Sequence, residues 1–546
     1  MKAATSKLMA LGVCALLLCA LAPAGAHAAF GVAQFSATAR NADGTIDLRA
    51  GSHPYAYTVF LQMNQDAEGN PEGNLRELIV DLPAGMVGNP QAVPRCSGAD
   101  FEGQFPHCPG NTQIGVAKAK LAGTTDTAIV PVYNLTPPLG VPASIGFSLV
   151  GANSLQEASL RPDDHGVRIS DITIPTEKPI QSITETIWGV PMEASHDPER
   201  FCLNNGGQIE TGCASEVAPE AFLSLPTSCG DPLQTTVGVD SVQEPGALVE
   251  QTALSLGEGG TPEGLTGCDR PPFGPSISSQ VETTRAESPT GLDFKLHIPQ
   301  TGVPKAGDPE GTATATAALR DALVELPSGL ELNPSTAAGL EACSLAQIEL
   351  GGSNPPSCPS ASQVGTVEVK TPLIDHPLPG EVYIARQGEN PFGSLIAIYI
   401  VVDDPLSGIV VKLAGEVEPD PATGELRAKV QQNPQLPFED LSFHFFGGPR
   451  ASFTTPAVCG TYATATELTP WTFPAESPVH ASDTFTVTQS AGGGACAGSL
   501  GQLPNAPTFE AGTTNPLAGS YSPFVIRLAR SNGSQRFGAL NLTLPL

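Results

Sequence analysis

The sequence is poor in charge, in aromatic side chains and in basic residues. Charged residues make up 15% and aromatic residues 5% of the 546 residues, with only two tryptophans. Its 26 lysines and arginines are outnumbered by 55 aspartates and glutamates, which gives a formal net charge of −29. A chain this acidic repels phosphate backbones, so we expect no nucleic-acid partner. A high negative charge also favours solubility, as is typical of a secreted protein.

Long apolar runs are also missing beyond the N-terminus, so we expect no transmembrane segment in the mature chain. The N-terminus has the features of a secretory signal peptide: two lysines, an apolar run over residues 8–22, and an Ala-His-Ala cleavage site at 26–28. We predict that residues 1–28 are a signal peptide. The mature protein is then secreted or extracellular, and a location on the cell surface is compatible with this.

No long stretch has the 3.6-residue period of an amphipathic helix, whereas a strand pattern occurs three times. It reads ELIVDLPAGM at 77–86, ALVELPSGL at 322–330 and ALNLTLPL at 539–546. Apolar residues alternate in each copy and the run ends at a proline, which cannot donate to a strand ladder. The 58 glycines and 53 prolines stay below the share typical of disordered chains. The sequence therefore predicts an all-β protein.

The remaining segments of the chain are duplicated as well. CPGNTQIG, which begins at Cys108, matches CPSASQVG, which begins at Cys358, and ITETIWGVP at 183–191 matches LSFHFFGGP at 441–449. Short alternating strands between Pro and Gly turns favour antiparallel sheets. We predict tandem antiparallel β-sandwich (Ig-like) units with disulfide-stapled lobes. The units are repeat unit 1 at 29–274, repeat unit 2 at 275–507 and an incomplete third unit at 508–546.

Ten cysteines remain after the predicted cleavage, an even number for an oxidising compartment. Paired cysteines should recur together in the repeats, so the duplication predicts which ones are joined. Metal binding is the alternative, but the chain has no Cys-x-x-Cys and no paired histidines at ligand spacing, so we expect no metal and no cofactor. The predicted disulfides are Cys96–Cys108, Cys343–Cys358, Cys229–Cys268, Cys459–Cys496 and Cys202–Cys213.

Unit 1 carries an insertion at 192–220 that unit 2 lacks. Insertions in repeat proteins form loops, and such loops often make the binding face. The alternative is a stapled surface loop in which Asp197 pairs locally with Arg200. Trp188 could be a platform for a sugar, but Phe446 takes its place in unit 2, which favours a core aromatic. The candidate binding loop consists of Trp188, His196, Asp197, Glu199 and Arg200.

Motifs of catalysis are missing: there is no Gly-x-Ser-x-Gly, no His-Glu-x-x-His and no phosphate-binding loop. The acidic turns Asp163-Asp164-His165 and Asp403-Asp404 could ligate calcium, but neither lies in a loop of the EF-hand type. Paired carboxylates for glycoside hydrolysis remain open, because spacing in sequence does not give spacing in space. We name no catalytic residue.

Several motifs together resemble a known group of proteins. They are the Ser-His-Pro strand, the Leu-Pro-x-Gly strand, Cys-Pro-x-x-x-Gln-(Ile/Val)-Gly, and Trp-Gly-Val-Pro followed by Ser-His-Asp. In these the chain resembles uncharacterised, repetitive, secreted proteins of high-GC Gram-positive bacteria, over nearly all of its mature length. The resemblance implies an exported, surface-associated repeat protein, and it transfers no activity and no functional residue.

Two functions follow from these features. The first is a secreted or cell-surface, non-enzymatic β-repeat protein with a structural, adhesive or ligand-binding role. The alternative is a secreted hydrolase with a single site in the unit 1 insertion. The partners that we expect are cell-envelope or extracellular proteins or glycans. Self-association through the edge of the C-terminal strands, within 508–546, is a further expectation, because a three-stranded piece exposes open edges.

Overall fold

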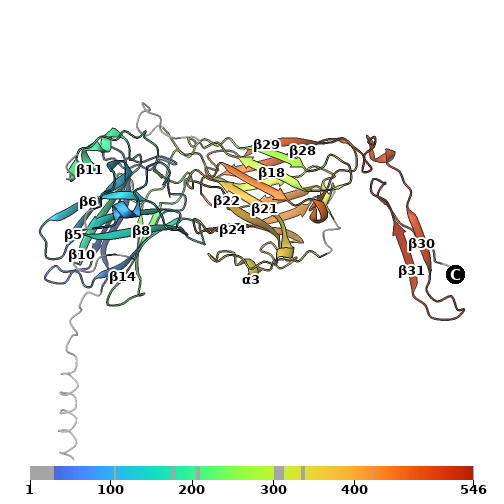
Figure 1. Ribbon diagram of the computed structural model, residues 1–546, viewed down its shortest axis with the longest axis horizontal. Helices are drawn as coiled ribbons and strands as arrows, with labels where there is room; N and C mark the ends of the chain where they lie inside the picture. The colour runs from blue at the N-terminus through green and yellow to red at the C-terminus, as the bar shows by residue number, and fades with distance from the viewer. Residues whose placement is uncertain are drawn as a thin grey trace, which may run out of the picture.

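The computed structural model describes residues 30–103, 106–149, 151–172, 174, 179–203, 209–300, 313–333, 339–421 and 423–544 (Figure 1). The predicted signal peptide lies outside the described residues. The described part of the chain is built almost wholly of antiparallel strands, and it contains no helix with the length and hydropathy of a membrane span.

One antiparallel sheet of 11 strands, called sheet 1, contains most of the chain before residue 255. Its first and last strands lie in contact, so the sheet curls on itself around an apolar interior. In spatial order its strands are β1 (Val32–Arg40), β2 (Ala56–Met63), β10 (Ile180–Trp188), β5 (Gln113–Leu121), β6 (Thr127–Leu135), β7 (Ser144–Leu149), β8 (Ala152–Leu160), β9 (Val167–Asp171), β3 (Leu75–Asp81), β14 (Gln234–Ser241) and β15 (Val249–Leu254).

A second sheet of 11 strands, called sheet 2, repeats the same order. Its outer strands also meet, and the backbone N–H of Ser279 donates to Asp483 Oδ2 across the seam at 2.8 Å. Its strands are β16 (Ser276–Val281), β18 (Leu292–His297), β26 (Asp440–Phe445), β21 (Gln363–Lys370), β22 (Leu378–Ile384), β23 (Ile396–Asp404), β24 (Ile409–Pro419), β25 (Leu426–Val430), β19 (Leu319–Glu325), β28 (Gly460–Pro470) and β29 (Val479–Val487).

Short elements decorate the two sheets. They are β4 (Val87–Gly88) with β13 (Leu223–Ser224), β11 (Phe201–Leu203) with β12 (Ile209–Thr211), β17 (Pro289–Thr290) and β20 (Glu331–Leu332) with β27 (Phe453–Thr454), the helices α2 (Gly98–Phe101) and α3 (Leu345–Ile348), and the 3-10 turns η1 (Gly110–Thr112), η2 (Ala194–Glu199), η4 (Ser360–Ser362), η5 (Gly448–Arg450) and η6 (Leu500–Gln502).

Residue alternation explains why these segments form strands with one buried face. In β18, Leu292, Phe294 and Leu296 are buried while Asp293 and Lys295 are exposed, which is the period-2 pattern of a half-buried strand. The prediction of tandem antiparallel all-β units is confirmed. The cysteine-bounded segments are not separate lobes. The segment between Cys229 and Cys268 adds a hairpin to sheet 1, and the segment between Cys459 and Cys496 adds one to sheet 2.

Five disulfides hold the loops of the two sheets: four are the pairs that the repeats predict, and Cys202–Cys213 joins the two cysteines that those four leave over. Closing a loop of about 15 residues stabilises a fold by roughly 3 kcal/mol in the chain-entropy model. The bridges join Cys96 to Cys108, Cys202 to Cys213, Cys229 to Cys268, Cys343 to Cys358 and Cys459 to Cys496.

The two sheets touch end to end. The end of sheet 1 at which β3 and β8 finish lies against the end of sheet 2 at which β19 and β24 begin. Figure 1 shows β8 and β24 on the facing sides of the two sheets. The N–H of Gly140 donates to the carbonyl of Leu406 at 2.9 Å, and the N–H of Ala315 donates to the carbonyl of Gly51 at 2.7 Å. Backbone hydrogen bonds of this kind fix the register of one sheet on the other.

The last described strands stand apart from both sheets. Strands β30 (Thr508–Thr513) and β31 (Phe524–Ala529) pair only with each other and extend away from sheet 2 in Figure 1. Residues 540–544, which repeat the Leu-Pro strand, form no ladder in the described structure. An ion pair between Arg530 and Glu287, 2.7 Å long, ties the base of the hairpin to sheet 2.

Gly408 offers a test of the contact between the sheets. Its φ of +70° and a Cβ that would lie 2.1 Å from the carbonyl oxygen of Gly140 leave no room for a side chain. We expect Gly408→Ala to separate the two loops and to destabilise the protein by roughly 1–3 kcal/mol beyond the cost of the backbone strain. Gly388→Ala is the matched control, because φ is +69° there and nothing lies within 4 Å. Equal thermal midpoints for both variants would contradict this contact.

Candidate functional site

The unit 1 insertion begins directly after β10, and its first turn folds back over the end of that strand. The ring of His196 lies between the rings of Tyr55 and Trp188, with centroids 4.3 and 4.5 Å away. Trp188, His196 and Arg200 are all at most 1% exposed. The structure therefore places these candidate residues in a closed aromatic stack.

Charge in this stack is paired internally. The guanidinium of Arg200 lies 5.8 Å from the ring centre of Trp188, donates to the carbonyl of Pro191 at 2.8 Å, and pairs with Asp197 at 3.3 Å. Burial lowers the pKa of Arg200, and the hydrogen bonds that Arg200 donates to Asp197 act against that shift. Glu199, the fifth candidate residue, is exposed to solvent at the end of η2. The structure thus brings four of the five candidates together and leaves Glu199 outside.

The imidazole of His196 is buried, and burial affects its protonation. Neither ring nitrogen has a hydrogen-bond partner among the described residues. Burial, together with the nearby charge of Arg200, lowers the pKa of His196 to about 3. The imidazole is therefore neutral at ordinary pH, and the flanking rings enclose it. A general base needs to reach the proton that it abstracts, and this geometry gives it no such reach.

The other polar positions that the sequence singled out form local turns and ion pairs. Asp164 accepts from the guanidinium of Arg161 at 2.8 and 2.7 Å. Asp404 accepts from Ser407 at 2.5 Å and lies 2.9 Å from Nε2 of His376. Among the described residues, one group has the spacing of metal ligands, Cys202 with Glu210 and Cys213. Its two sulfurs are joined in a disulfide, so they do not offer thiolates to a metal.

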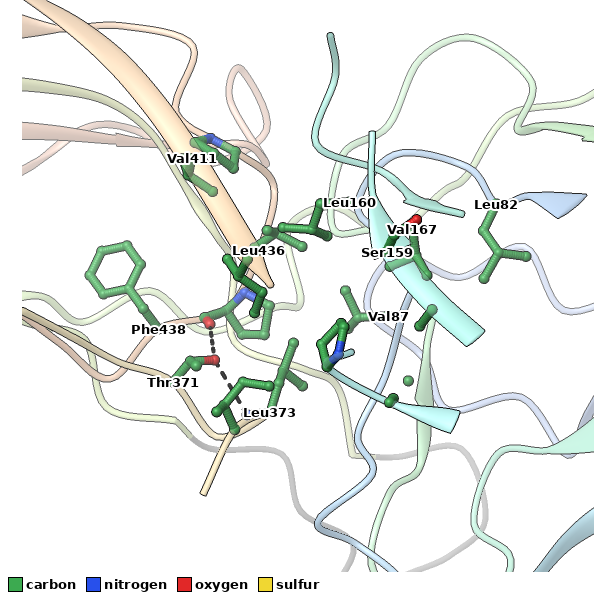
Figure 2. A pocket seen from close by; sticks show the side chains of 18 of the residues that line it. Leu82, Val87, Ser159, Leu160, Val167, Thr371, Leu373, Val411, Leu436 and Phe438 are labelled. Atoms are coloured by element: carbon green, nitrogen blue, oxygen red, sulfur yellow. Dashed lines mark hydrogen bonds between the residues drawn. The ribbon is translucent and has the colours of Figure 1, made fainter. Parts of the chain in front are cut away.

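A cavity of about 350 Å³ runs from the interior of sheet 1 into the interior of sheet 2. Figure 2 shows it from close by, with Leu82, Leu160 and Val167 of sheet 1 on one side and Val411 and Phe438 of sheet 2 on the other. Its wall consists almost wholly of aliphatic and aromatic side chains that point inward from the strands of both sheets. A concave, mostly apolar site of this size is typical of small-molecule binding sites.

One wall of this cavity carries polar groups. On β10, Glu185 stands between the inward-facing residues Ile183 and Ile187, all three of which line the cavity. Glu185 Oε2 accepts from Gln156 Nε2 at 2.9 Å, and Ser154 donates to Asp171 beside them. We call Ser154, Gln156, Asp171 and Glu185 the polar cluster of sheet 1.

Burial raises the pKa of the Glu185 carboxyl to about 7, with a further contribution from the charge of Asp171, whereas the hydrogen bond from Gln156 lowers it. By surface area Glu185 is only partly buried, because some of its surface faces the cavity. Its Oε1 oxygen is itself buried and accepts no hydrogen bond from any described residue. A buried oxygen without a partner is costly, which marks this position within an otherwise apolar wall.

The cavity and its polar cluster escaped the sequence analysis. A signal was present in ITETIWGVP, because Ile183, Glu185 and Ile187 alternate, which puts a carboxylate on the apolar face of the strand. The same motif in unit 2 has Phe443 at that position. The insertion has the more conspicuous polar sequence, but of its candidate residues His196, Asp197 and Arg200 are packed against β10.

Comparisons with known proteins give little further information. No family model matches the chain, and no curated protein sequence matches it. Among solved structures it is similar to the C-terminal domain of the AgI/II polypeptide BspA of Streptococcus agalactiae, at 8% identity and a TM-score of 0.18, covering 83% of this chain and 99% of that chain. It is also similar to the Enterococcus faecalis MSCRAMM ACE, at 7% identity and a TM-score of 0.17, covering 83% of this chain and 94% of that chain. Similarity this low assigns neither fold nor function.

The buried state of His196 predicts how stability depends on pH. The pKa of His196 is about 3 in the folded protein and near 6.5 in the unfolded chain. The neutral ring therefore contributes fully to the free energy of unfolding above pH 6.5, and this contribution is lost as the pH falls toward 3. The loss amounts to at most about 5 kcal/mol. We expect His196→Phe, which keeps an aromatic ring in the stack, to lose less stability than the parent between pH 6.5 and 4 in urea unfolding. Parallel curves for the two proteins would contradict a buried neutral histidine.

Proposed function

We propose that this protein is an exported, non-enzymatic β-repeat protein that binds an apolar ligand in the cavity between its two sheets. The observation that carries the proposal is the continuous, aliphatic cavity of about 350 Å³. Protein interiors normally pack as densely as organic crystals. At about 24 cal/mol per Å³, an empty volume of this size would cost roughly 8 kcal/mol, which is comparable to the stability of a whole domain. An apolar occupant offsets that cost.

Several features support an extracellular setting for this binding role. The five disulfides suit an oxidising compartment, the N-terminal sequence has the pattern of a signal peptide, and the net charge of −29 favours solubility. We place the protein outside the cell or at its surface. Its proposed macromolecular partners are cell-envelope or extracellular proteins or glycans.

The alternative of a secreted hydrolase in the unit 1 insertion has less support. Its best candidate base, His196, is enclosed by Tyr55 and Trp188, and its charged neighbour Arg200 is paired with Asp197. A structural role explains all of these contacts. The insertion then serves to cover the end of β10, and the binding role belongs to the interior of the sheets.

The proposal predicts uptake of a neutral apolar dye. N-phenylnaphthylamine should become fluorescent on binding to the purified protein. Ala322 lines the cavity from β19, whereas the next residue, Leu323, belongs to the outer face of the same strand. We expect Ala322→Phe to occupy part of the cavity and to weaken dye binding by at least about 10-fold, a free-energy difference near 1.4 kcal/mol. Leu323→Phe is the control and should bind as the parent does. No fluorescence with the parent protein would refute the proposal.

A second role is supported by the C-terminal hairpin. In sheets 1 and 2 the counterparts of β31 are β2 and β18, whose outer edges are covered by β10 and β26. In the described structure β31 pairs with β30 alone, and Phe524, Val525 and Ile526 are 42–52% exposed. An exposed, apolar strand edge is a template for pairing with another chain. We propose that β31 pairs with β31 of a second copy, since two identical edges form a closed, symmetric contact.

This second role predicts a dimer whose stability depends on the edge. In sedimentation equilibrium, the Val525→Lys variant should contain a larger fraction of monomer than the parent protein, because a charge on the edge opposes strand addition. Leu500→Lys, at an exposed leucine in η6 outside the hairpin, should leave the dimer unchanged. In the parent protein, amide hydrogen exchange over 524–529 should slow as the protein concentration rises. In the Val525→Lys variant it should not. A parent that stays monomeric at all concentrations would contradict the pairing.

A further inference from the structure

The polar cluster of sheet 1 is a local departure from an otherwise apolar repeat. In sheet 1, Gln156 pairs with Asp171, and Asp171 pairs with Leu78. In sheet 2, the corresponding ladder joins Gly415 to Val430 and Val430 to Ala322. Leu78 and Ala322 are equivalent positions in the repeated Leu-Pro strand. The two polar residues of sheet 1 therefore correspond to a glycine and a valine in sheet 2.

Glu185 likewise has an apolar counterpart in sheet 2. It stands opposite Val59 of β2 and Ala117 of β5, whereas Phe443 in sheet 2 stands opposite Phe294 and Val367. The fold thus accommodates an entirely apolar set at these positions, as sheet 2 demonstrates. The polar residues are not needed to build this type of sheet, and burying them without full hydrogen bonding costs stability. Such a cost in one repeat alone points to a role other than folding.

The cluster lies on the wall of the cavity, set back from its junction with sheet 2. Strand β3 ends at Asp81, and Leu78, which is opposite Asp171, lies three residues before that end. From the cluster, the cavity continues past Leu160 and Val411 into sheet 2, where its lining is aliphatic and aromatic except for Thr371 and Asn433. The acidic side chains that line the cavity, Asp171 and Glu185, therefore lie together in sheet 1, and the sheet 2 end is mainly apolar.

From this juxtaposition we propose that the cavity holds a single-chain amphiphile, with a hydrogen-bond-donating head on the polar cluster and its apolar chain directed into sheet 2. The head is a hydroxyl or an ammonium group. The proposal rests on the binding function proposed above and adds the chemistry and the orientation of the ligand.

The chemistry of the cluster selects this kind of head. Among the described residues, none donates to Glu185 Oε1, and Asp171 lies nearby as a second carboxylate. A donor completes the hydrogen bonding of Glu185, and an ammonium adds an ion pair. A carboxylate head would instead meet two acidic groups in a low-dielectric site, where like charges repel strongly. The site therefore favours long-chain alcohols and amines over long-chain carboxylates.

The experiment compares three ligands that share a 12-carbon chain. Dodecylamine, 1-dodecanol and dodecanoate are each titrated at pH 8 against the full-length protein carrying bound N-phenylnaphthylamine, and displacement is followed by fluorescence. We expect the amine and the alcohol to displace the dye at concentrations at least about 10-fold lower than dodecanoate. Binding of the amine should weaken from pH 8 to pH 5.5 as Glu185 is protonated, whereas binding of the alcohol should change little. The groups around Glu185 are Gln156 and Asp171, with Ser154 hydrogen-bonded to Asp171, and uncharged Val59 and Ala117 lie opposite Glu185 on the neighbouring strands.

Two variants make the test specific. Glu185→Gln keeps the size of the side chain and removes one of the two carboxylates, so it should reduce the preference for the amine over dodecanoate and abolish the pH dependence of amine binding that comes from Glu185. Glu157→Gln makes the same chemical change one residue from Gln156, on the outer face of β8, and should preserve both. Equal displacement by all three ligands with the parent protein would overturn the head-group proposal while supporting an apolar site. Failure of the dye and of every ligand to bind would instead refute the binding function itself.

Discussion

The closure of each sheet on itself is the constraint on which the rest of the structure depends. In both sheets 11 strands run in a single ladder, and the first and last strands come into contact. Inward-facing residues alternate with outward-facing ones along every strand, so closure creates an interior whose lining is set by the period-2 pattern. A ring of this many strands is wider than the side chains of Val, Leu and Ile can fill. The cavity is therefore a direct consequence of strand number.

Joining two such sheets end to end turns two interiors into one. The contact is made by loops, such as the one that carries Gly408 against Gly140, and it leaves the centre open. The insertion in unit 1 has a different task, because its aromatic stack covers the end of β10 at Trp188. The two repeats thus share a framework, and among their differences are the insertion and the polar cluster inside sheet 1.

Much of this architecture could be predicted from the sequence. Alternation in segments such as Leu292–His297 indicated strands, and the duplication indicated both the tandem arrangement and the cysteine pairs. Which residues meet across the interior could not be predicted, because Gln156 and Glu185 lie on different strands and come together only through the order of strands in the ladder. The polarity of the insertion was misleading for a related reason: His196 and Arg200 each pack on the ring of Trp188, which sequence spacing does not reveal.

The order of strands also bears on how the protein acquires its structure after synthesis. The second strand, β2, pairs on one side with β1, its neighbour along the chain, and on the other with β10, where Leu61 lies opposite Ile183. More than a hundred residues separate these two partners, so the contact order of each unit is high, and folding of such topologies is slow because loop closure precedes the stabilising contacts. A nascent unit cannot complete its ladder until its entire length is available. The short Cys96–Cys108 loop can form while the distant strands are still unpaired.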